Sequence, residues 1–228
     1  MKRIFTIIAF LLISGSLHGS SRIENPIFTQ LSVGEIPGQA WAPGISLGYH
    51  IDESWALTFT RHEAYEISRH DESWNAQQGG EGINASVEQV GARQAVEIRY
   101  SPSLWGVYFS IGYIDNGSDQ EVIDYDRRFR TIGSSKYDTD MHLVLTRPAG
   151  ESIGLGLGFH YLSTQKWSFN LGILIGIDPV PEYDISLQTS AIISNSDKKQ
   201  FTDDLQEKLS GIIDNRYHQF NLGIGFAW

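Results

Sequence analysis

The chain contains no cysteine among its 228 residues. This absence excludes a disulfide framework, a thiolate metal site, a cysteine nucleophile and a lipidated cysteine anchor. Basic residues are also scarce, because 17 Lys and Arg stand against 27 Asp and Glu, which gives a formal net charge of −10. A chain this acidic is a poor candidate for nucleic-acid binding, and we expect no nucleic-acid partner.

Long apolar runs are missing after the first 21 residues. The longest one, residues 171–177, is far short of the roughly 20 residues that a membrane-spanning helix needs. At the start of the chain, a short positive segment precedes the apolar run 4–13, and small residues follow it. That order predicts a cleaved signal peptide over residues 1–21 and an exported domain over residues 22–228. Such a domain can cross a membrane only as a closed β-barrel.

Large and small residues alternate strictly in much of the exported domain. In residues 167–177, Trp, Phe, Leu and Ile fill the odd positions, whereas Ser, Asn and Gly fill most of the even ones. Residues 105–113, 153–161 and 220–228 repeat the pattern. A period of two places each set on one face of a β-strand. The Gly-rich face suits the crowded lumen of a narrow barrel whose large apolar face is turned to lipid.

The alternation predicts an all-β fold, namely an eight-stranded antiparallel up-and-down transmembrane barrel in the outer membrane of a Gram-negative-type bacterium. Short turns alternate with long connections, as they do in barrels whose turns are periplasmic and whose loops lie outside. The long connections are expected at residues 35–42, 67–87, 116–150 and 179–215. The strands are expected at residues 27–34, 43–51, 55–66, 88–100, 105–115, 151–163, 167–178 and 216–228.

One long connection leaves the number of strands open. Residues 121–131 and 137–147 have the composition of a hairpin. This hairpin would either extend above the membrane or add two strands and make the barrel ten-stranded.

Aromatic residues flank the short turns. All of them lie on the apolar face, at the same end of the expected barrel. Trp and Tyr at this level form an interfacial girdle in outer-membrane barrels. The predicted girdle consists of Tyr49, Trp55, Tyr100, Trp105, Tyr161, Trp167 and Trp228.

The last residues of the chain, with Asn221, Gly223, Phe226 and Trp228 at fixed spacing, resemble the C-terminal β-signal of outer-membrane proteins. The terminal Trp departs from the usual Phe. The resemblance implies two partners, the barrel-assembly machinery and outer-membrane lipid. The whole exported domain resembles small outer-membrane barrels of the OmpA, OmpX and OmpW type. Those families include anchors, adhesion and invasion proteins and small channels, so the fold does not fix the function.

Inward-facing positions predict a polar lumen just wide enough for side chains. We expect paired charges and hydrogen bonds to fill it as a plug, whereas a narrow polar path or a proton-active site is the alternative. Arg61 is expected on the outward face, where a bulge after Phe59 or an early exit of the strand from the membrane would accommodate it. The predicted lumen network comprises His50, His62, Arg93, Glu97, Arg99 and His160.

The last long connection contains an amphipathic stretch, residues 197–213, with apolar residues on one helical face. It predicts a helix that covers the barrel mouth, and contact with a partner is the alternative. Aromatic residues in the loops are candidates for such contacts, namely Trp74, Tyr125 and Tyr137.

Two groups of acids and histidines raise the question of catalysis or metal binding. Asp138, Asp140 and His142 resemble part of the carboxylate–histidine arrangement of barrel-rim proteases, but no complete catalytic constellation is present. Segment 115–121 has oxygen ligands without the spacing of a calcium loop. We therefore expect no enzyme activity, metal or cofactor. The second group consists of His62, Glu63, His70, Asp71 and Glu72.

The leading hypothesis is a non-enzymatic barrel that anchors acidic surface loops for a structural or interaction role with a surface partner. The alternative is a small channel for ions or apolar solutes, and an outer-membrane hydrolase comes third. A continuous plug of Arg and Glu in the lumen would argue against the channel. A side opening or a dry apolar funnel would argue for it.

Overall fold

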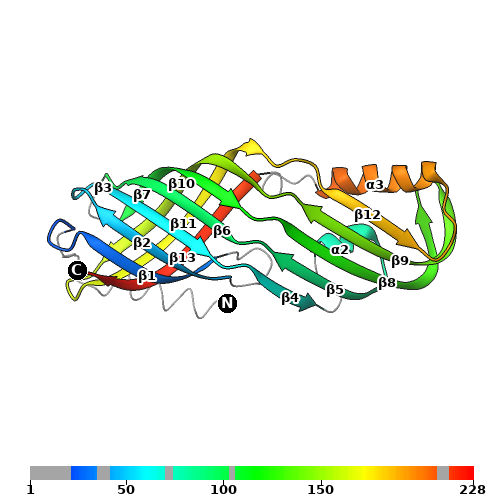
Figure 1. Cartoon of the computed structure of the whole chain (residues 1–228), viewed down its shortest axis with the longest axis horizontal. Coiled ribbons are helices and arrows are strands. Elements are labelled where there is room, and N and C mark those ends of the chain that lie inside the picture. The colour runs from blue at the N-terminus through cyan, green and yellow to red at the C-terminus, as the bar shows by residue number, and fades with distance from the viewer. Residues whose placement is uncertain (1–21, 35–41, 70–73, 103–105, 210–215) are drawn as a thin grey trace.

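The computed structural model describes residues 22–34, 42–69, 74–102, 106–209 and 216–228. Eight strands close into an antiparallel barrel in the order β1-β13-β11-β10-β7-β6-β3-β2 (Figure 1), which confirms the predicted fold. The predicted signal peptide, residues 1–21, lies outside the described residues. The barrel strands are β1 (Ile27–Gly34), β2 (Ala42–His50), β3 (Trp55–His62), β6 (Arg93–Tyr100), β7 (Val107–Asn116), β10 (Gly150–Leu162), β11 (Trp167–Pro179) and β13 (Arg216–Ala227).

Side chains of the barrel strands alternate between a buried and an exposed face. In β3, Ala56, Thr58 and Thr60 are buried, whereas the large residues between them are exposed. The exposed face is strongly apolar around the barrel, with Leu31 at 74% exposure and Leu155 at 61%. Monomeric soluble proteins rarely expose apolar surface of this extent, so the outside of the barrel requires an apolar environment.

Arg61 keeps its outward position without a bulge. The register of β2 with β3 is unbroken through the pairs of Ile45 with Arg61 and Gly44 with His62. Arg61 is one residue from the end of β3, and its Nε donates to Glu63 Oε1 at 2.9 Å. The guanidinium therefore lies at the rim of the barrel, which agrees with an early exit of the strand.

Three of the expected long connections contain further strands, which form a second sheet. We call this five-stranded antiparallel sheet, in the order β12-β9-β8-β5-β4, the distal sheet (Figure 1). The predicted hairpin exists as β8 and β9, and it belongs to the distal sheet and not to a ten-stranded barrel. The strands are β4 (Tyr65–Arg69), β5 (Ile83–Val90), β8 (Asp119–Ile132), β9 (Ser135–Arg147) and β12 (Asp184–Thr189).

Two helices, α2 (Trp74–Gly79) and α3 (Asn195–Leu209), pack on one face of the distal sheet (Figure 1). The helix in the last long connection was predicted correctly, but its position over the barrel mouth was wrong. Leu205 and Leu209 are buried against the sheet, because its apolar face offers α3 a larger surface than the polar lumen does. No helix in the described residues is long and apolar enough to cross a bilayer. The core of this layer comprises Ala76, Ile123, Tyr125, Met141, Leu143, Leu145, Leu205 and Leu209.

Short links join the barrel to the distal sheet. Gly91 follows β5 and Gly117 follows β7, and the two links lie side by side, because the Gly117 amide donates to the Ala92 carbonyl at 2.7 Å. A Cβ on Gly91 would lie 2.6 Å from the carbonyl carbon of Gly117. Glycine is therefore needed at this crossing for the backbones to approach one another.

Candidate functional site

The lumen contains a buried ion pair. Arg99 Nη2 donates to Glu97 Oε1 at 2.7 Å, and both side chains are at least 94% buried. Ser110 donates to the second carboxylate oxygen at 2.7 Å, and Arg99 Nη1 donates to Asn170 at 3.0 Å. Tyr108 lies beneath the guanidinium, with 4.5 Å between Arg99 Cζ and the ring centroid. These contacts form a compact polar plug across the barrel.

His50 and His160 form a second group, near the short turns. Their rings stack with centroids 5.2 Å apart, and Phe28 contacts both. His160 Nε2 is 2.9 Å from Ser168 Oγ. Arg22 extends into this end of the lumen and donates to the backbone carbonyls of Glu53 and His160. This group packs the turn end of the lumen.

His62 and Arg93 lie opposite each other at the other end of the barrel. His62 Nε2 is 3.3 Å from Ser32 Oγ, and its Nδ1 is 3.4 Å from the Gln219 amide. Arg93 pairs with Asp119 of the distal sheet, at 2.8 Å. The six predicted lumen residues are thus all buried.

Apolar side chains close the lumen at two further levels. Phe28, Leu162 and Ala227 form a buried cluster near the turn end. Toward the distal sheet, a larger cluster packs around Leu174, which fills the space left by glycines on the neighbouring strands. The second cluster consists of Ala95, Ile114, Leu174, Val180 and Tyr217.

The aromatic residues of the predicted girdle point outward at the end opposite the distal sheet. Trp55 and Tyr100 contact each other across β3 and β6, with ring centroids 4.8 Å apart. Tyr49, Trp167 and Trp228 are exposed, whereas Tyr161 is half-buried. Trp105 lies outside the described residues. The arrangement fits an interfacial level on the barrel wall.

The four residues of the predicted β-signal are on β13 or directly follow it. Asn221 and Gly223 face the lumen, and Asn221 Nδ2 donates to Ser46 Oγ at 3.1 Å. Phe226 and Trp228 face outward, and Phe226 packs on Trp167 with ring centroids 4.0 Å apart. These residues lie where β13 pairs with β1 to close the barrel.

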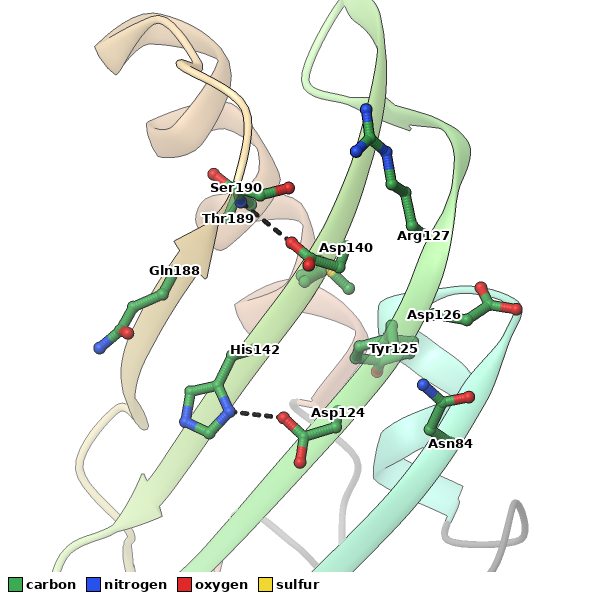
Figure 2. Close-up of a pocket in the computed structure, with 11 residues that line it drawn as sticks. Asn84, Asp124, Tyr125, Asp126, Arg127, Asp140, His142, Gln188, Thr189 and Ser190 are labelled. Carbon is green, nitrogen blue, oxygen red and sulfur yellow. Dashed lines mark hydrogen bonds and ion pairs between the residues drawn. The ribbon is translucent and has the colours of Figure 1, made fainter.

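A pocket of about 550 Å³ opens on the distal sheet, on the face away from the helices (Figure 2). His142 Nδ1 lies 2.6 Å from Asp124 Oδ1 on the neighbouring strand. Asp140 instead accepts from the Ser190 amide at 3.0 Å, and the Ser190 hydroxyl and amide hold the pKa of Asp140 below its usual range. The lining includes Asn84, Asp126, Arg127 and Gln188.

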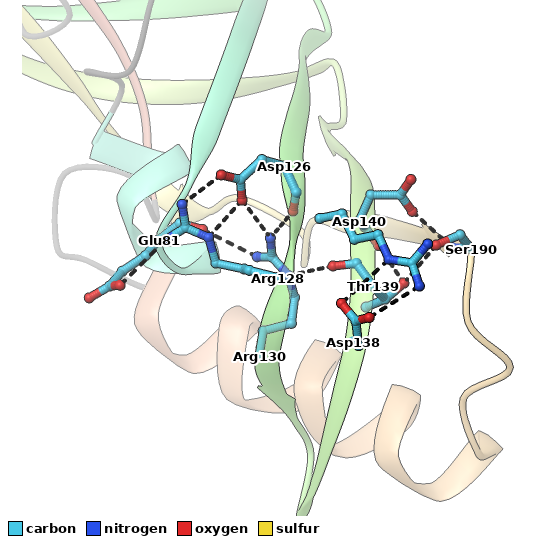
Figure 3. A network of polar contacts seen from close by, with 9 residues as sticks. Glu81, Asp126, Arg128, Arg130, Asp138, Thr139, Asp140 and Ser190 are labelled. Atoms are coloured by element: carbon cyan, nitrogen blue, oxygen red, sulfur yellow. Dashed lines mark hydrogen bonds and ion pairs between the residues drawn. The ribbon is translucent and has the colours of Figure 1, made fainter.

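The acid–histidine motif of residues 138–142 is not assembled as a unit. Asp138 pairs with Arg127 at 3.1 Å and not with His142. The next arginines along β8 are held by Asp126, which Arg128 contacts at 2.6 Å and Arg130 at 3.4 Å (Figure 3). The partner of His142 is therefore Asp124, which comes from another strand and which spacing along the sequence could not reveal.

The remaining candidates for ligands and contacts have structural partners. Tyr125 is buried, and its hydroxyl donates to the Ala76 carbonyl at 2.7 Å. Tyr137 donates to Asp197 at 2.6 Å, so both tyrosines have partners within the distal layer. Trp74 begins α2, but its side chain lies outside the description, as do His70, Asp71 and Glu72.

Metal-binding groups are absent from the described part of the chain, where no three His, Asp or Glu side chains cluster. Asp119, in the segment considered for calcium, accepts hydrogen bonds from Arg93 and from the Gly91 amide. His62 and Glu63 are likewise engaged, with Ser32 and Arg61 respectively.

A search of solved structures finds the same fold elsewhere. The crystal structure of Acinetobacter baumannii CarO matches with a TM-score of 0.60 and 14% identity, over 89% of this chain and 98% of that chain. Acinetobacter baumannii CarO2 matches with a TM-score of 0.61 and 14% identity, over 90% and 99%. No protein-family model and no curated protein matches the chain. At this level of identity the likeness shows the fold alone, which is that of a small eight-stranded barrel.

Proposed function

We propose that this chain is an outer-membrane protein whose barrel anchors the distal sheet at the cell surface for contact with a partner, without catalysis. The observation that carries the proposal is the distal sheet itself, which has its own core of sheet and helix side chains. Joining two barrel strands needs only a few residues. Long connections that fold into an ordered layer instead form a surface on which recognition residues can be held.

The outside of the barrel supports a membrane location. Exposed apolar residues cover it, and the aromatic residues mark one end. The polar inside and apolar outside are reversed from a soluble barrel, as they are in proteins that cross the outer membrane. The likeness to barrels from Acinetobacter baumannii supports a bacterial outer membrane.

The filled lumen counts against a permanent ion pore. Arg99 and Glu97 fill part of it together with Tyr108, and the clusters around Phe28 and Leu174 fill two further parts. A lumen of eight strands has no room for an ion path beside such a plug. In planar bilayers we expect the refolded chain to give no discrete current steps. Reproducible steps would favour the channel.

The pocket on the distal sheet does not favour catalysis. The pair of His142 and Asp124 resembles half of a catalytic arrangement, but both side chains are well exposed, at 41% and 55%. A base needs a nucleophile or a positioned water and donors that stabilise the developing charge. The neighbouring Asp140 accepts a hydrogen bond from Ser190, and Asp138 forms an ion pair with Arg127.

Single-cysteine labelling tests the proposed orientation, because the chain has no cysteine of its own. Gln188→Cys places a thiol on the distal sheet, and Thr164→Cys places one at the opposite, turn end; both positions are exposed. In intact cells, a membrane-impermeant maleimide should label the first variant. The second should react only after the outer membrane is opened. Labelling of Thr164→Cys alone in intact cells would reverse the orientation and overturn the proposal.

A further inference from the structure

The distal sheet has one covered and one uncovered face. The helices α2 and α3 cover the side of Ile123, Leu143 and Leu145. On the other side, which we call the open face, three rows of side chains run across the strands in register. One row consists of Ser68, Val87, Val122, Val144 and Ser186, and the flanking rows consist of Glu66, Gln89, Gln120, Thr146 and Asp184 and of Ala85, Asp124, His142 and Gln188.

The central row of the open face is partly apolar, and the flanking rows are acidic. The three valines are half-buried and form a continuous strip across β5, β8 and β9. The flanking rows contribute three carboxylates, from Glu66, Asp124 and Asp184, and these fourteen positions hold no Lys or Arg. A strip of this kind fits alkyl chains that carry positive charges at their ends.

The net charge of the layer around the distal sheet limits the kinds of partner that can bind there. Its described segments, residues 63–69, 74–92, 117–149 and 180–209, contain sixteen Asp and Glu against nine Lys and Arg, a formal excess of seven negative charges. The arginines near the pocket, Arg127, Arg128 and Arg130, are each paired with carboxylates. The field at this end of the molecule therefore attracts cations and repels anions.

We propose that the open face docks a Lys- and Arg-rich polypeptide segment, whose side-chain stems lie on the valine strip and whose charges meet Asp124, Asp184 and Glu66. The proposal rests on the proposed function, since it names the kind of partner that the anchored sheet binds. The pocket beside His142 and Gln188 gives one such side chain a recess at the margin of the face (Figure 2). Complementary charge selects a basic segment as the partner, and the ordered strands fix where its side chains lie on the face.

The test uses the full refolded chain in nanodiscs of zwitterionic phosphatidylcholine, so that lipid charge plays no part. The probe is a fluorescein-labelled peptide of alternating lysine and valine, followed by fluorescence anisotropy, with a glutamate–valine peptide as its control. We expect the lysine peptide to bind and the glutamate peptide not to. The double variant Asp124→Asn/Asp184→Asn should weaken binding by about tenfold.

A charge-matched control separates the face from the overall charge. Asp204→Asn/Glu207→Gln removes the same charge from exposed positions of α3, on the other side of the sheet, and should change the affinity less than about twofold. Equal losses in both double variants would show attraction by net charge alone and would overturn the proposal. Absence of binding to the unmodified chain would overturn it as well.

The centre of the face provides a second variant. Val122→Lys places a cation in the valine strip and should abolish binding of the lysine peptide, whereas Val122→Thr should retain most of it. If Val122→Lys changed only a monomer–dimer balance in sedimentation, the occupant would be a second copy, and the proposal would fail. Cysteine labelling at Gln188 is independent of these outcomes, so the anchoring function can stand when the docking proposal falls.

Discussion

Asp119 on β8 accepts a hydrogen bond from Arg93 on β6, with 2.8 Å between Oδ2 and Nη2. The pair joins the distal sheet to the barrel, and both side chains are largely buried, at 18% and 3% exposure. Arg147 on β9 approaches the same carboxylate oxygen at 3.6 Å. One carboxylate thus holds arginines from both layers of the molecule.

Replacing Asp119 should loosen the distal sheet and leave the barrel intact. In Asp119→Asn, two buried guanidinium groups lose their carboxylate, at a cost of about 3–5 kcal/mol. We expect faster proteolysis within residues 119–147, while the heat-dependent gel mobility of the barrel is unchanged. Asp184→Asn, on the exposed side of the same sheet, is the control and should be cut at the wild-type rate. Equal rates for both variants would contradict the role assigned to Asp119.

The lumen ion pair should behave as a unit. Glu97→Ala leaves Arg99 buried without its carboxylate and should destabilise the barrel by about 3–5 kcal/mol. The double variant Glu97→Leu/Arg99→Met removes both charges and should recover most of that stability, since apolar replacements of a buried pair are often neutral or stabilising. The measurement is the temperature at which each variant loses its folded mobility on a gel. A double variant weaker than Glu97→Ala would refute this interpretation.

Tyr108 occupies space that glycines on two neighbouring strands leave free. A Cβ on Gly172 would overlap the Tyr108 hydroxyl, whereas it would lie 3.1 Å from Cζ of that ring. Gly172→Ala should therefore lower the unfolding temperature, and Gly172→Ala/Tyr108→Phe should partly restore it. Overpacking of this kind typically costs about 1–3 kcal/mol. Failure of Tyr108→Phe to rescue would place the strain elsewhere.

Asp197 attaches α3 to the β8–β9 turn. Tyr137, the Ser134 amide and Ser194 donate to its carboxylate and hold the pKa of Asp197 well below its usual range. The attachment is therefore strongest above the ordinary aspartate pKa of about 3.9 and weakens as the pH falls through the lower folded value. Asp197→Asn should raise amide exchange in α3 at neutral pH and reduce its dependence on acid.

Hydrogen exchange of α3, corrected for the intrinsic rate at each pH, checks this prediction. Asp204→Asn serves as the control, because Asp204 is exposed on the same helix. Protection in the Asp197→Asn variant that matched the wild type at neutral pH would argue that the apolar contacts of Leu205 and Leu209 alone hold the helix.

The barrel was largely predictable because its alternation is regular, and the strand boundaries agree within a few residues for most strands. The distal sheet was not, since a period of two reveals a strand but not the sheet to which it belongs. Within β8, a register shift between Tyr125 and Arg128 also breaks the pattern. The partner of β9 on its other side, β12, comes about 40 residues later in the chain.

The candidate site was predictable only in part, and for a similar reason. Burial of the six lumen residues follows from the inward face of each strand. Which of them meet depends on the stagger between strands, so the stacking of His50 on His160 was hidden. The pairing of Asp124 with His142 likewise needs the β8–β9 register, which the spacing of residues 138–142 cannot supply.

The links between the two layers have a mechanical consequence. Within the described residues, the chain passes between barrel and distal sheet through the short segments 63–64, 91–92, 117–118, 148–149 and 180–183. A pulling force applied to the distal sheet would be shared among these backbone segments in parallel and transmitted to strands that pair with a neighbour on both sides in the barrel. If the distal sheet binds a partner as proposed, this connection would be stiff, and under a pulling force we expect the partner to detach before the barrel unfolds.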